Sequence, residues 1–388
     1  MDRVMQALIL FGIAAALAIV GCDDLDEQHE DGAELGADPS NDPHDVSKPW
    51  EYPYHLVIGG GLSETLSVLT VQGPGDWSIA NDVQDACAGI NQMTWRDGRL
   101  FALCSLSNSL VTYDAEDLSI TGEVSLGDGR NPMNFAFDGD DRIHVSNFLT
   151  NDVTLHDLDD GSTLATVPLP YLDEAHLDNP DSETWPRPGS LIPDGDRLLV
   201  AVANLSAQFT PGGPGAIHVV DTTAHAVAVE VLLAGRDTTT LLASPGAQCV
   251  FALSAGDYAV GTGFAGNGVV ECLDPATLAP LAVIETGGAP MGESVAAPNG
   301  RVYVGNAMDA RILVFDSATL EIRPEIDLRG DTDGPELSFV SGIAVDGNGF
   351  LYATDFNHDR LFIVDTNTNE ILAKFDTCDG PDTLEFVR

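Results

Sequence analysis

The sequence is poor in positive charge. Its 388 residues include 16 lysines and arginines against 61 aspartates and glutamates, which leaves a formal net charge of −45. The sequence has two lysines, Lys48 and Lys374. Nucleic-acid binding depends on basic groups that neutralise phosphates, and docking on anionic lipid headgroups has the same requirement. The composition therefore excludes both kinds of surface, and we expect no nucleic-acid partner.

The short motifs of common active sites are also missing. The sequence has no G-x-S-x-G nucleophile elbow, no H-E-x-x-H zinc motif, no C-x-x-C pair and no phosphate-binding loop. Without a convergent base, nucleophile or metal cluster, no side chain can be assigned a catalytic role. We therefore expect neither a catalytic residue nor a cofactor, and keep a bound Ca²⁺ ion as the alternative.

Long hydrophobic runs are absent except at the N-terminus. Residues 4–20 are almost wholly apolar and are followed by Gly21 and Cys22, which is the pattern of a secretory signal. The tetrapeptide Ile19-Val20-Gly21-Cys22 resembles the lipobox of bacterial lipoproteins. The resemblance implies a signal peptide at 1–21, acylation of Cys22, and a lipid anchor that holds the chain in the bacterial cell envelope, outside the cytoplasm. An uncleaved membrane anchor is the alternative.

Residues 22–49 form an acidic segment after the predicted cleavage point. They contain ten acidic residues, a single lysine, and no aromatic residue or isoleucine. Such a segment cannot bury enough apolar surface to fold. We interpret 22–49 as a disordered tether between the lipid and a folded domain at 50–388.

The folded domain contains an internal repeat. A short hydrophobic run that ends in aspartate recurs at intervals of 42 to 64 residues, and two further apolar runs precede each copy. The aspartates, which we interpret as turn formers, are Asp114, Asp157, Asp221, Asp274, Asp316 and Asp365. Turn pairs such as Asp97-Gly98 and Asn299-Gly300 separate the upstream runs and signal hairpins. A fourth run follows each aspartate.

Four apolar runs in each repeat predict an all-β fold, a seven-bladed β-propeller of four-stranded antiparallel blades. We name the strands of each blade a, b, c and d from the axis outward. Six blades are complete in the sequence, and a first blade at 55–83 lacks its innermost strand. Residues 383–388 follow the last d strand where an a strand is due. The C-terminal strand should therefore complete the first blade and close the ring, which hides the sheet edges.

The strand phrases of the repeat resemble a known family. Ile-His-Val-Ser-Asn, Tyr-Val-Gly-Asn and Tyr-Ala-Thr-Asp on b strands, with Val-Phe-Asp and Ile-Val-Asp on c strands, are similar to the YVTN-type repeat, which is close to the NHL repeat. The resemblance covers about 330 residues and implies the propeller fold. The family includes lactonase-like enzymes and binding proteins without known chemistry, and none of its catalytic residues can be placed in this sequence.

One face of the propeller should carry the ligand site. Turns between a and b and between c and d are short, whereas insertions at 168–188, 205–215, 254–267 and 328–337 fall in b–c and d–a connections of neighbouring blades. Loops on a rigid scaffold commonly carry specificity. Polar residues at strand ends near this face are candidates for ligand binding, with strand-end capping as the alternative. They are Asn147, Asn204, Glu293, Asn306 and Asp355.

Five cysteines follow Cys22, and an exported chain favours disulfides. We predict a disulfide between Cys249 and Cys272, with residues 253 and 268 paired, at the base of the 254–267 loop. Cys87 with Cys104 is the most plausible second pair, which leaves Cys378 free.

The sequence thus favours a monomeric, non-catalytic binding propeller on the cell envelope. Its b–c/d–a face on blades 3–6 would bind a polar small molecule or an envelope protein. The alternative is a lactonase-like or lyase-like enzyme with a cation-assisted site near the axis.

Overall fold

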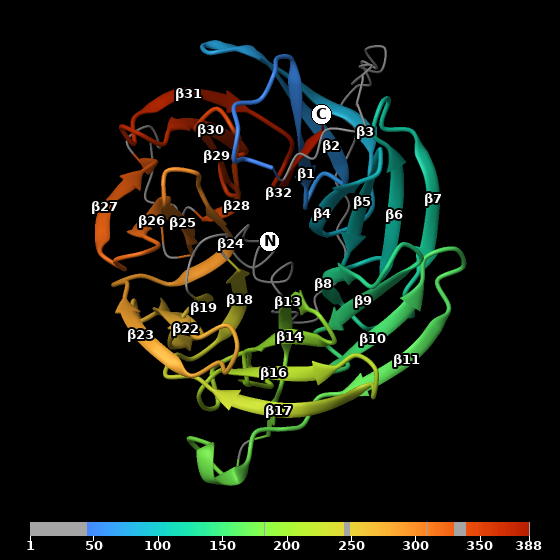
Figure 1. Cartoon of the computed structure of the whole chain (residues 1–388), viewed down its shortest axis with the longest axis vertical. Coiled ribbons are helices and arrows are strands. Elements are labelled where there is room, and N and C mark those ends of the chain that lie inside the picture. The colour runs from blue at the N-terminus through green and yellow to red at the C-terminus, as the bar shows by residue number, and fades with distance from the viewer. Residues whose placement is uncertain (1–44, 182, 244–248, 308, 330–338, 388) are drawn as a thin grey trace.

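The computed structural model describes residues 45–387 except 182, 244–248, 308 and 330–338. Within them, seven four-stranded antiparallel sheets surround a central axis as the blades of a propeller (Figure 1). The predicted fold class is therefore confirmed. The signal peptide, Cys22 and the tether up to residue 44 lie outside the described residues. No helix among the described residues has the length and hydrophobicity needed to cross a bilayer.

Each blade is a meander from the axis outward. Blade 1 has β32 (Pro381–Val387) innermost, then β1 (Tyr54–Gly60), β2 (Thr65–Gly73) and β3 (Asp76–Asp85). Blade 2 has β4 (Ile90–Arg96), β5 (Arg99–Cys104), β6 (Ser109–Asp114) and β7 (Ile120–Ser125). Blade 3 has β8 (Pro132–Phe137), β9 (Arg142–Asn147), β10 (Asp152–Asp157) and β11 (Thr163–Pro168). Blade 4 has β13 (Pro188–Asp194), β14 (Arg197–Val202), β16 (Ala216–Asp221) and β17 (Ala226–Leu232).

The remaining blades repeat the same order. Blade 5 has β18 (Thr238–Ala243), β19 (Val250–Ser254), β22 (Val269–Leu273) and β23 (Pro280–Glu285). Blade 6 has β24 (Pro290–Ala296), β25 (Arg301–Asn306), β26 (Arg311–Asp316) and β27 (Ile322–Asp327). Blade 7 has β28 (Val340–Val345), β29 (Phe350–Asp355), β30 (Arg360–Asp365) and β31 (Ile371–Asp376). We call the end of the ring with the a–b and c–d turns the turn face, and the end with the b–c and d–a connections the loop face.

The C-terminal strand closes the ring as predicted. β32 pairs antiparallel with β1, with Leu56 opposite Phe386 and Ile58 opposite Leu384. Trp50 packs edge-on against Phe386, with ring centroids 4.7 Å apart. Aromatic contacts of this kind add to the free energy of burial. The two ends of the folded domain are thus joined by main-chain pairing and by a shared apolar core.

The repeated aspartates at the ends of the c strands are turn formers, as predicted. In every copy, a carboxylate oxygen accepts a hydrogen bond from the main-chain N–H two residues further on, at 2.7 to 3.1 Å. This local bond fixes the c–d turn. The b and c strands are buried along almost their whole length, because the neighbouring blades cover both of their faces.

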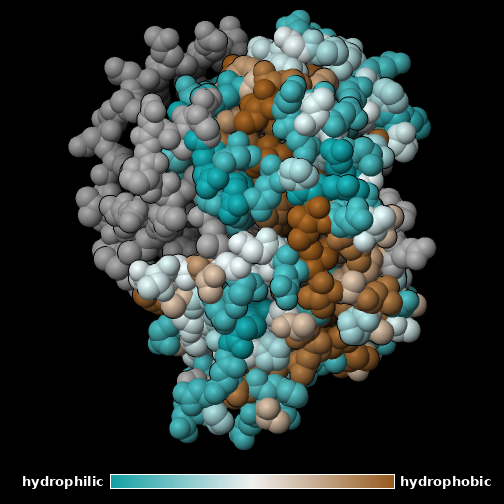
Figure 2. Space-filling view, turned by 90° about the vertical axis from the view of Figure 1, so that its left-hand side faces the viewer, coloured by the Kyte–Doolittle hydropathy of each residue, from teal (hydrophilic) through white to brown (hydrophobic). Residues whose placement is uncertain are grey.

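The outer strands leave apolar side chains at the surface. Figure 2 shows hydrophobic clusters that interrupt the hydrophilic surface on the side of the ring that carries β23, β27 and β31. The exposed large apolar residues on these strands are Leu281, Val283, Ile322, Ile371 and Leu372. Along β23 and β27, exposed positions alternate with half-buried or buried ones, as expected for an edge strand that packs through one face, whereas Ile371 and Leu372 at the start of β31 are both exposed.

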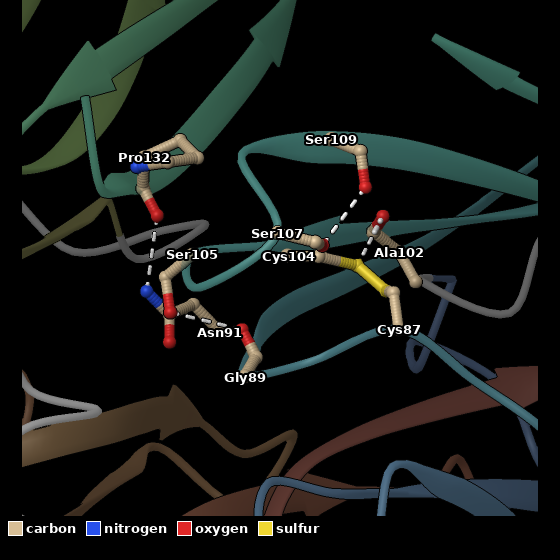
Figure 3. The surroundings of a disulfide bond; sticks show 9 residues. All are labelled: Cys87, Gly89, Asn91, Ala102, Cys104, Ser105, Ser107, Ser109 and Pro132. Carbon is tan, nitrogen blue, oxygen red and sulfur yellow. Dashed lines mark hydrogen bonds between the residues drawn. A yellow bond between two sulfur atoms is a disulfide. The ribbon is translucent and has the colours of Figure 1, made fainter. Parts of the chain in front are cut away.

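The described part of the chain contains two disulfides, one near each face of the ring. Cys87, in the d–a connection before β4, is joined to Cys104 at the loop-face end of β5 (Figure 3). Near it, the Asn91 side chain donates to the Pro132 carbonyl at 3.1 Å and so links blade 2 to blade 3. Cys378 is a buried free thiol, and burial raises its pKa to about 11.

The second disulfide joins Cys249 to Cys272 but lies elsewhere than expected. The predicted pairing of 253 with 268 is wrong, because Leu253 pairs with Val270 and Phe251 lies opposite Cys272. Cys249 precedes β19, so the bridge joins the turn-face ends of the two strands. It does not staple the base of the 254–267 loop, which leaves the same strands at their other ends. The alternation of side chains alone did not fix this register.

Candidate functional site: the central channel and its loop-face mouth

A channel runs along the axis and encloses about 800 Å³. All seven inner strands contribute to its wall. At the turn face the segment 45–50 approaches the channel. Val46 lines it, and the Trp50 main-chain N–H donates a hydrogen bond to the Asn348 side chain, in the a–b turn of blade 7, at 3.0 Å. At the other end of the channel, on the loop face, the longer connections surround its mouth.

Polar side chains on the inner strands link each blade to the next. Every inner strand of blades 2–7 has a bulge near its loop-face end. Gln92 at the first of these accepts a hydrogen bond from the Phe135 N–H at 2.7 Å, across the junction of blades 2 and 3. Ser190 accepts one from the Leu241 N–H at 2.6 Å, across the junction of blades 4 and 5. A bulge re-aims a side chain, and here it directs polar groups sideways along the channel wall.

We call these polar side chains of the inner strands, which bond across blade junctions, the belt. Glu293 extends the belt across two junctions. Its carboxylate accepts a hydrogen bond from the Ile343 N–H at 3.0 Å and another from the Thr383 hydroxyl at 2.7 Å. The corresponding position of blade 7 is Gly342, which has no side chain to reach blade 1. The long Glu293 side chain thus ties blade 6 to blades 7 and 1.

Glu293 shares the channel wall with a second carboxyl group, Asp382 on β32. Burial raises the pKa of Glu293 to about 7, although the hydrogen bonds that its carboxylate accepts oppose the shift. Burial and the nearby charge of Glu293 raise the pKa of Asp382 well above its usual value. Among the described residues, no hydrogen bond reaches the Asp382 carboxyl. Burial and the repulsion between these two carboxyls therefore both disfavour their charged forms.

The other four predicted ligand residues lie at the ends of b strands, each in its own blade. The Asn147 amide donates to Asp152 at 2.8 Å and to Thr154 at 2.9 Å. The Asn204 amide donates to the Pro214 carbonyl at 2.8 Å.

Asn306 and Asp355 occupy the same strand-end position in blades 6 and 7. The Asn306 side chain accepts from the Ala289 N–H at 3.0 Å and donates to Asp309 at 2.8 Å. Asp355 contacts the His358 ring at 2.9 Å. All four residues are fully buried, and none lines the channel. Of the predicted set, the structure brings only Glu293 to the channel, and a role for the others in ligand binding stays a prediction.

Three of the predicted insertions meet above blades 3–5. In the first, η1 (Glu174–His176) is followed by β12 (Thr184–Trp185), which pairs with β15 (Leu205–Ser206) of the second. The third forms a small hairpin from β20 (Tyr258–Ala259) and β21 (Gly263–Phe264). Residues 330–337 of the fourth insertion lie outside the described residues.

Arg236 joins these three insertions. It lies in the d–a connection between blades 4 and 5, and its guanidinium contacts Asp178 of the first insertion, the Pro211 carbonyl of the second at 3.2 Å and Asp257 of the third at 2.7 Å. The hydrogen bonds with Asp178 raise the pKa of Arg236 and lower that of Asp178. One arginine therefore holds the insertions as a single cap beside the channel mouth.

Arg187 lies where this cap meets the channel. Its guanidinium is within 5.0 to 5.3 Å of the ring centres of Phe148, Trp185 and Phe209. Nη1 donates to the Phe148 carbonyl at 3.0 Å, and Nε is buried without a partner. The residue is 8% exposed and lines the channel. No carboxylate among the described residues forms an ion pair with it.

Arg187 is not among the residues predicted from the sequence, although its position carries a signal. It immediately precedes inner strand β13, as Asn131 precedes β8 and Asp237 precedes β18. All three have positive φ and are buried, and each has a polar side-chain atom without a hydrogen bond. Burial raises the pKa of Asp237 to about 7. Aligning the residue before each inner strand would have found this set, which occupies the blades that carry the cap.

The described residues contain no group of three or more histidine, cysteine, aspartate or glutamate side chains placed to hold a metal ion.

Comparisons with known proteins bear on the fold. No protein-family model matches the sequence. No curated protein matches it either. Solved propeller structures are similar in fold. A putative 6-phosphogluconolactonase from Bacteroides fragilis is 14% identical, with a TM-score of 0.63 over 89% of this chain and 100% of that one. The hydrazine synthase of Kuenenia stuttgartiensis is 18% identical, with a TM-score of 0.58 over 76% of this chain and 88% of the other.

A third structure, the dihydro-heme d1 dehydrogenase NirN, is 14% identical, with a TM-score of 0.54 over 93% of this chain and 83% of that one. At such low identities the likeness is one of fold. The three neighbours also differ in their named activities, and a propeller does not by itself define a function.

Proposed function

We propose that this protein is a binding propeller that takes a small polar molecule into the loop-face mouth of its channel. The observation that carries the proposal is the distribution of polar groups around the channel. Its wall combines apolar side chains with a belt of polar groups, and unpaired buried polar atoms gather in the blades beneath the cap. A cavity with a few well-placed polar groups is the usual form of a small-molecule site.

The experiment is a screen of small polar molecules for binding to the full chain, repeated on a variant with a filled channel. Thr239 lines the channel on β18, and Thr239→Trp would occupy its mouth. Thr166→Trp makes the same change at an exposed position on outer strand β11 and is the matched control. We expect ligands to bind the wild type and the control but not the filled variant. Ligands that bind all three proteins equally would refute the channel as the site.

The alternative is a hydrolytic enzyme of the lactonase-like type, and Glu293 and Asp382 are the observation that favours it. Carboxyls with raised pKa values are suited to general acid–base chemistry. Both Glu293 oxygens, however, already accept hydrogen bonds within the belt, which leaves Asp382 as the available group. Lactone hydrolysis that Asp382→Asn abolishes and Thr166→Trp leaves unchanged would favour the enzyme over the binding protein.

We also propose that the protein is anchored to the bacterial cell envelope through a lipid on Cys22 and acts as a monomer. The lipobox resemblance and the acidic segment after it support this location, and the YVTN/NHL-type repeat is proposed as the family of the propeller. Incorporation of a labelled fatty acid into the wild type but not into Cys22→Ser is the expected result. Equal incorporation into both proteins would refute the anchor.

A further inference from the structure

We infer that Arg187 is the anion-binding residue of the channel and that the ligand is a small organic acid held there by its carboxylate. This inference rests on the proposed function and narrows the class of ligand. A buried guanidinium without a negatively charged partner is costly. Here the rings of Phe148, Trp185 and Phe209 and one carbonyl satisfy it only in part.

The contrast with Arg236 shows that Arg187 is unusual in this chain. Arg236 lies in the equivalent connection of the next blade and has two carboxylate partners, Asp178 and Asp257. The chain has 61 acidic residues, so a carboxylate for Arg187 would be easy to supply. Among the described residues, Arg187 is the one buried arginine, and it lies beside the cavity without such a partner. A carboxylate from outside would complete the pairing through charge-assisted hydrogen bonds.

The surroundings favour a carboxylate over a phosphate. Of the described residues that line the channel, Arg187 is the one basic residue, and Glu293, Asp382 and Glu385 line it as well. A phosphate group carries close to two negative charges at neutral pH, and the site offers a single positive charge to balance them. The net charge of −45 also repels a dianion more strongly than a monoanion.

The polar residues that line the channel beside Arg187 suggest that the organic acid also carries hydroxyl groups. Asn134, Ser190 and Thr239 line the channel on the two inner strands next to β13 and on β13 itself. The Ser190 oxygen accepts a hydrogen bond from the Leu241 N–H, which leaves its hydroxyl proton free to donate. A hydroxy acid would thus find the guanidinium for its carboxylate and polar neighbours for its hydroxyl groups.

The experiment measures saturable stabilisation of the full chain by glycolate, acetate and inorganic phosphate at constant ionic strength, with chloride as the reference salt. A ligand that binds the folded state raises the midpoint of thermal unfolding with its concentration. We expect glycolate to stabilise the wild type, and Arg187→Met to bind it at least about tenfold more weakly, as the loss of a charged hydrogen-bond partner implies. Arg187→Lys should retain part of the binding.

Arg99→Met is the matched control, because Arg99 is an exposed arginine that also stacks on a phenylalanine, 5.1 Å from the Phe101 ring. It should bind glycolate like the wild type. If Arg187→Met does not fold, glycolate binding is followed instead by NMR, through the ¹⁵N–¹H resonance of Arg187 Nε in the wild type. This resonance is assigned by its absence from the spectrum of Arg187→Lys. That resonance should shift saturably with glycolate.

Four results would overturn the inference: equal binding of glycolate by Arg187→Met and the wild type, no saturable effect of any anion, equal stabilisation by chloride, or tighter binding of phosphate than of glycolate. Failure of this inference and failure of the proposed function are distinguishable. If uncharged ligands bind the wild type and Arg187→Met alike but not Thr239→Trp, the channel binds ligands and the anion subsite is wrong.

Discussion

The two faces of the ring are built from the same strands but differ in how their connections are made. On the turn face, repeated aspartates accept hydrogen bonds from the main chain of their own turns, and each c–d turn is a local structure. On the loop face, side chains bond across blade junctions, three insertions meet at Arg236, and the buried Arg187 lacks a carboxylate partner. The c–d turns are therefore fixed within their own blades, although side chains beside the a–b turns, such as Arg96 and Arg301, also bond to the next blade. The loop face differs in that insertions from neighbouring blades meet there and buried polar groups are left without partners.

This difference predicts that packing is less tolerant at the loop face, and two glycine substitutions test it. A Cβ on Gly189, at the loop-face end of β13, would lie 2.2 Å from the Thr239 carbonyl oxygen of the next blade. A Cβ on Gly300, in an exposed a–b turn with φ +78°, would meet nothing within 4 Å. We expect Gly189→Ala to lower the free energy of unfolding by about 3 kcal/mol and Gly300→Ala by about 1 kcal/mol, from backbone strain alone.

Urea unfolding of the two variants measures this contrast. Equal losses would show that the inner strands shift easily at the loop face, and the comparison between the faces would fail.

The second prediction concerns the cap. Replacing Arg236 removes contacts with Asp178, Asp257 and the Pro211 carbonyl. Because both carboxylates are about half exposed, we expect Arg236→Met to lower the free energy of unfolding by only about 1–2 kcal/mol. The local effect should be larger, with faster hydrogen exchange in the three insertions.

The matched change on the turn face is Arg142→Met. Arg142 forms an ion pair with Asp138 at 3.1 Å within a single hairpin. Hydrogen exchange in the insertions should be unchanged in this variant. If Arg236→Met also leaves their exchange unchanged, the cap is held by its strand pairing and aromatic packing, and Arg236 is not its centre.

The same contrast explains what could be predicted from the sequence. The strands, their order and the closure by residues 383–388 were predictable, because each repeat carries its own hydrophobic pattern and its own turn residues. The c-strand aspartates were assigned correctly for the same reason, since an aspartate that caps its own turn needs no distant partner. Local patterns therefore determine the c–d turns almost completely.

The site was much less predictable, because its contacts cross blade junctions. Asn147 and Asn306 are polar and close to the loop face, but their partners lie within their own blades, and nothing local distinguished them from Glu293. Arg187 depends on Phe148 from blade 3 and Phe209 from a later insertion, which no spacing rule connects. The register of Cys249 and Cys272 was missed because a two-residue shift preserves the face of every side chain.

The last and smallest prediction tests the belt through its titratable member. A carboxyl whose pKa is higher in the folded protein holds its proton more tightly there. Its contribution to stability is therefore complete below the unfolded pKa, which is about 4.5 for glutamate, and is lost as the pH rises toward the folded value of about 7. Asp382 acts in the same direction, whereas burial lowers the pKa of His144 and His218 and makes acid destabilising in part of the same window.

The comparison of Glu293→Gln with the wild type isolates the Glu293 contribution from these other groups. A glutamine amide can accept from the Ile343 N–H and donate to the Thr383 hydroxyl, so the belt is kept while the titration is removed. The variant should gain stability relative to the wild type between about pH 4.5 and 7, by about 1 kcal/mol, because the side chain is only partly buried and channel water reduces the effect. Denaturant unfolding across this range measures it. A difference that does not change with pH would mean that Glu293 titrates normally, and that the loop-face belt, like the turn face, holds no group for which protonation matters.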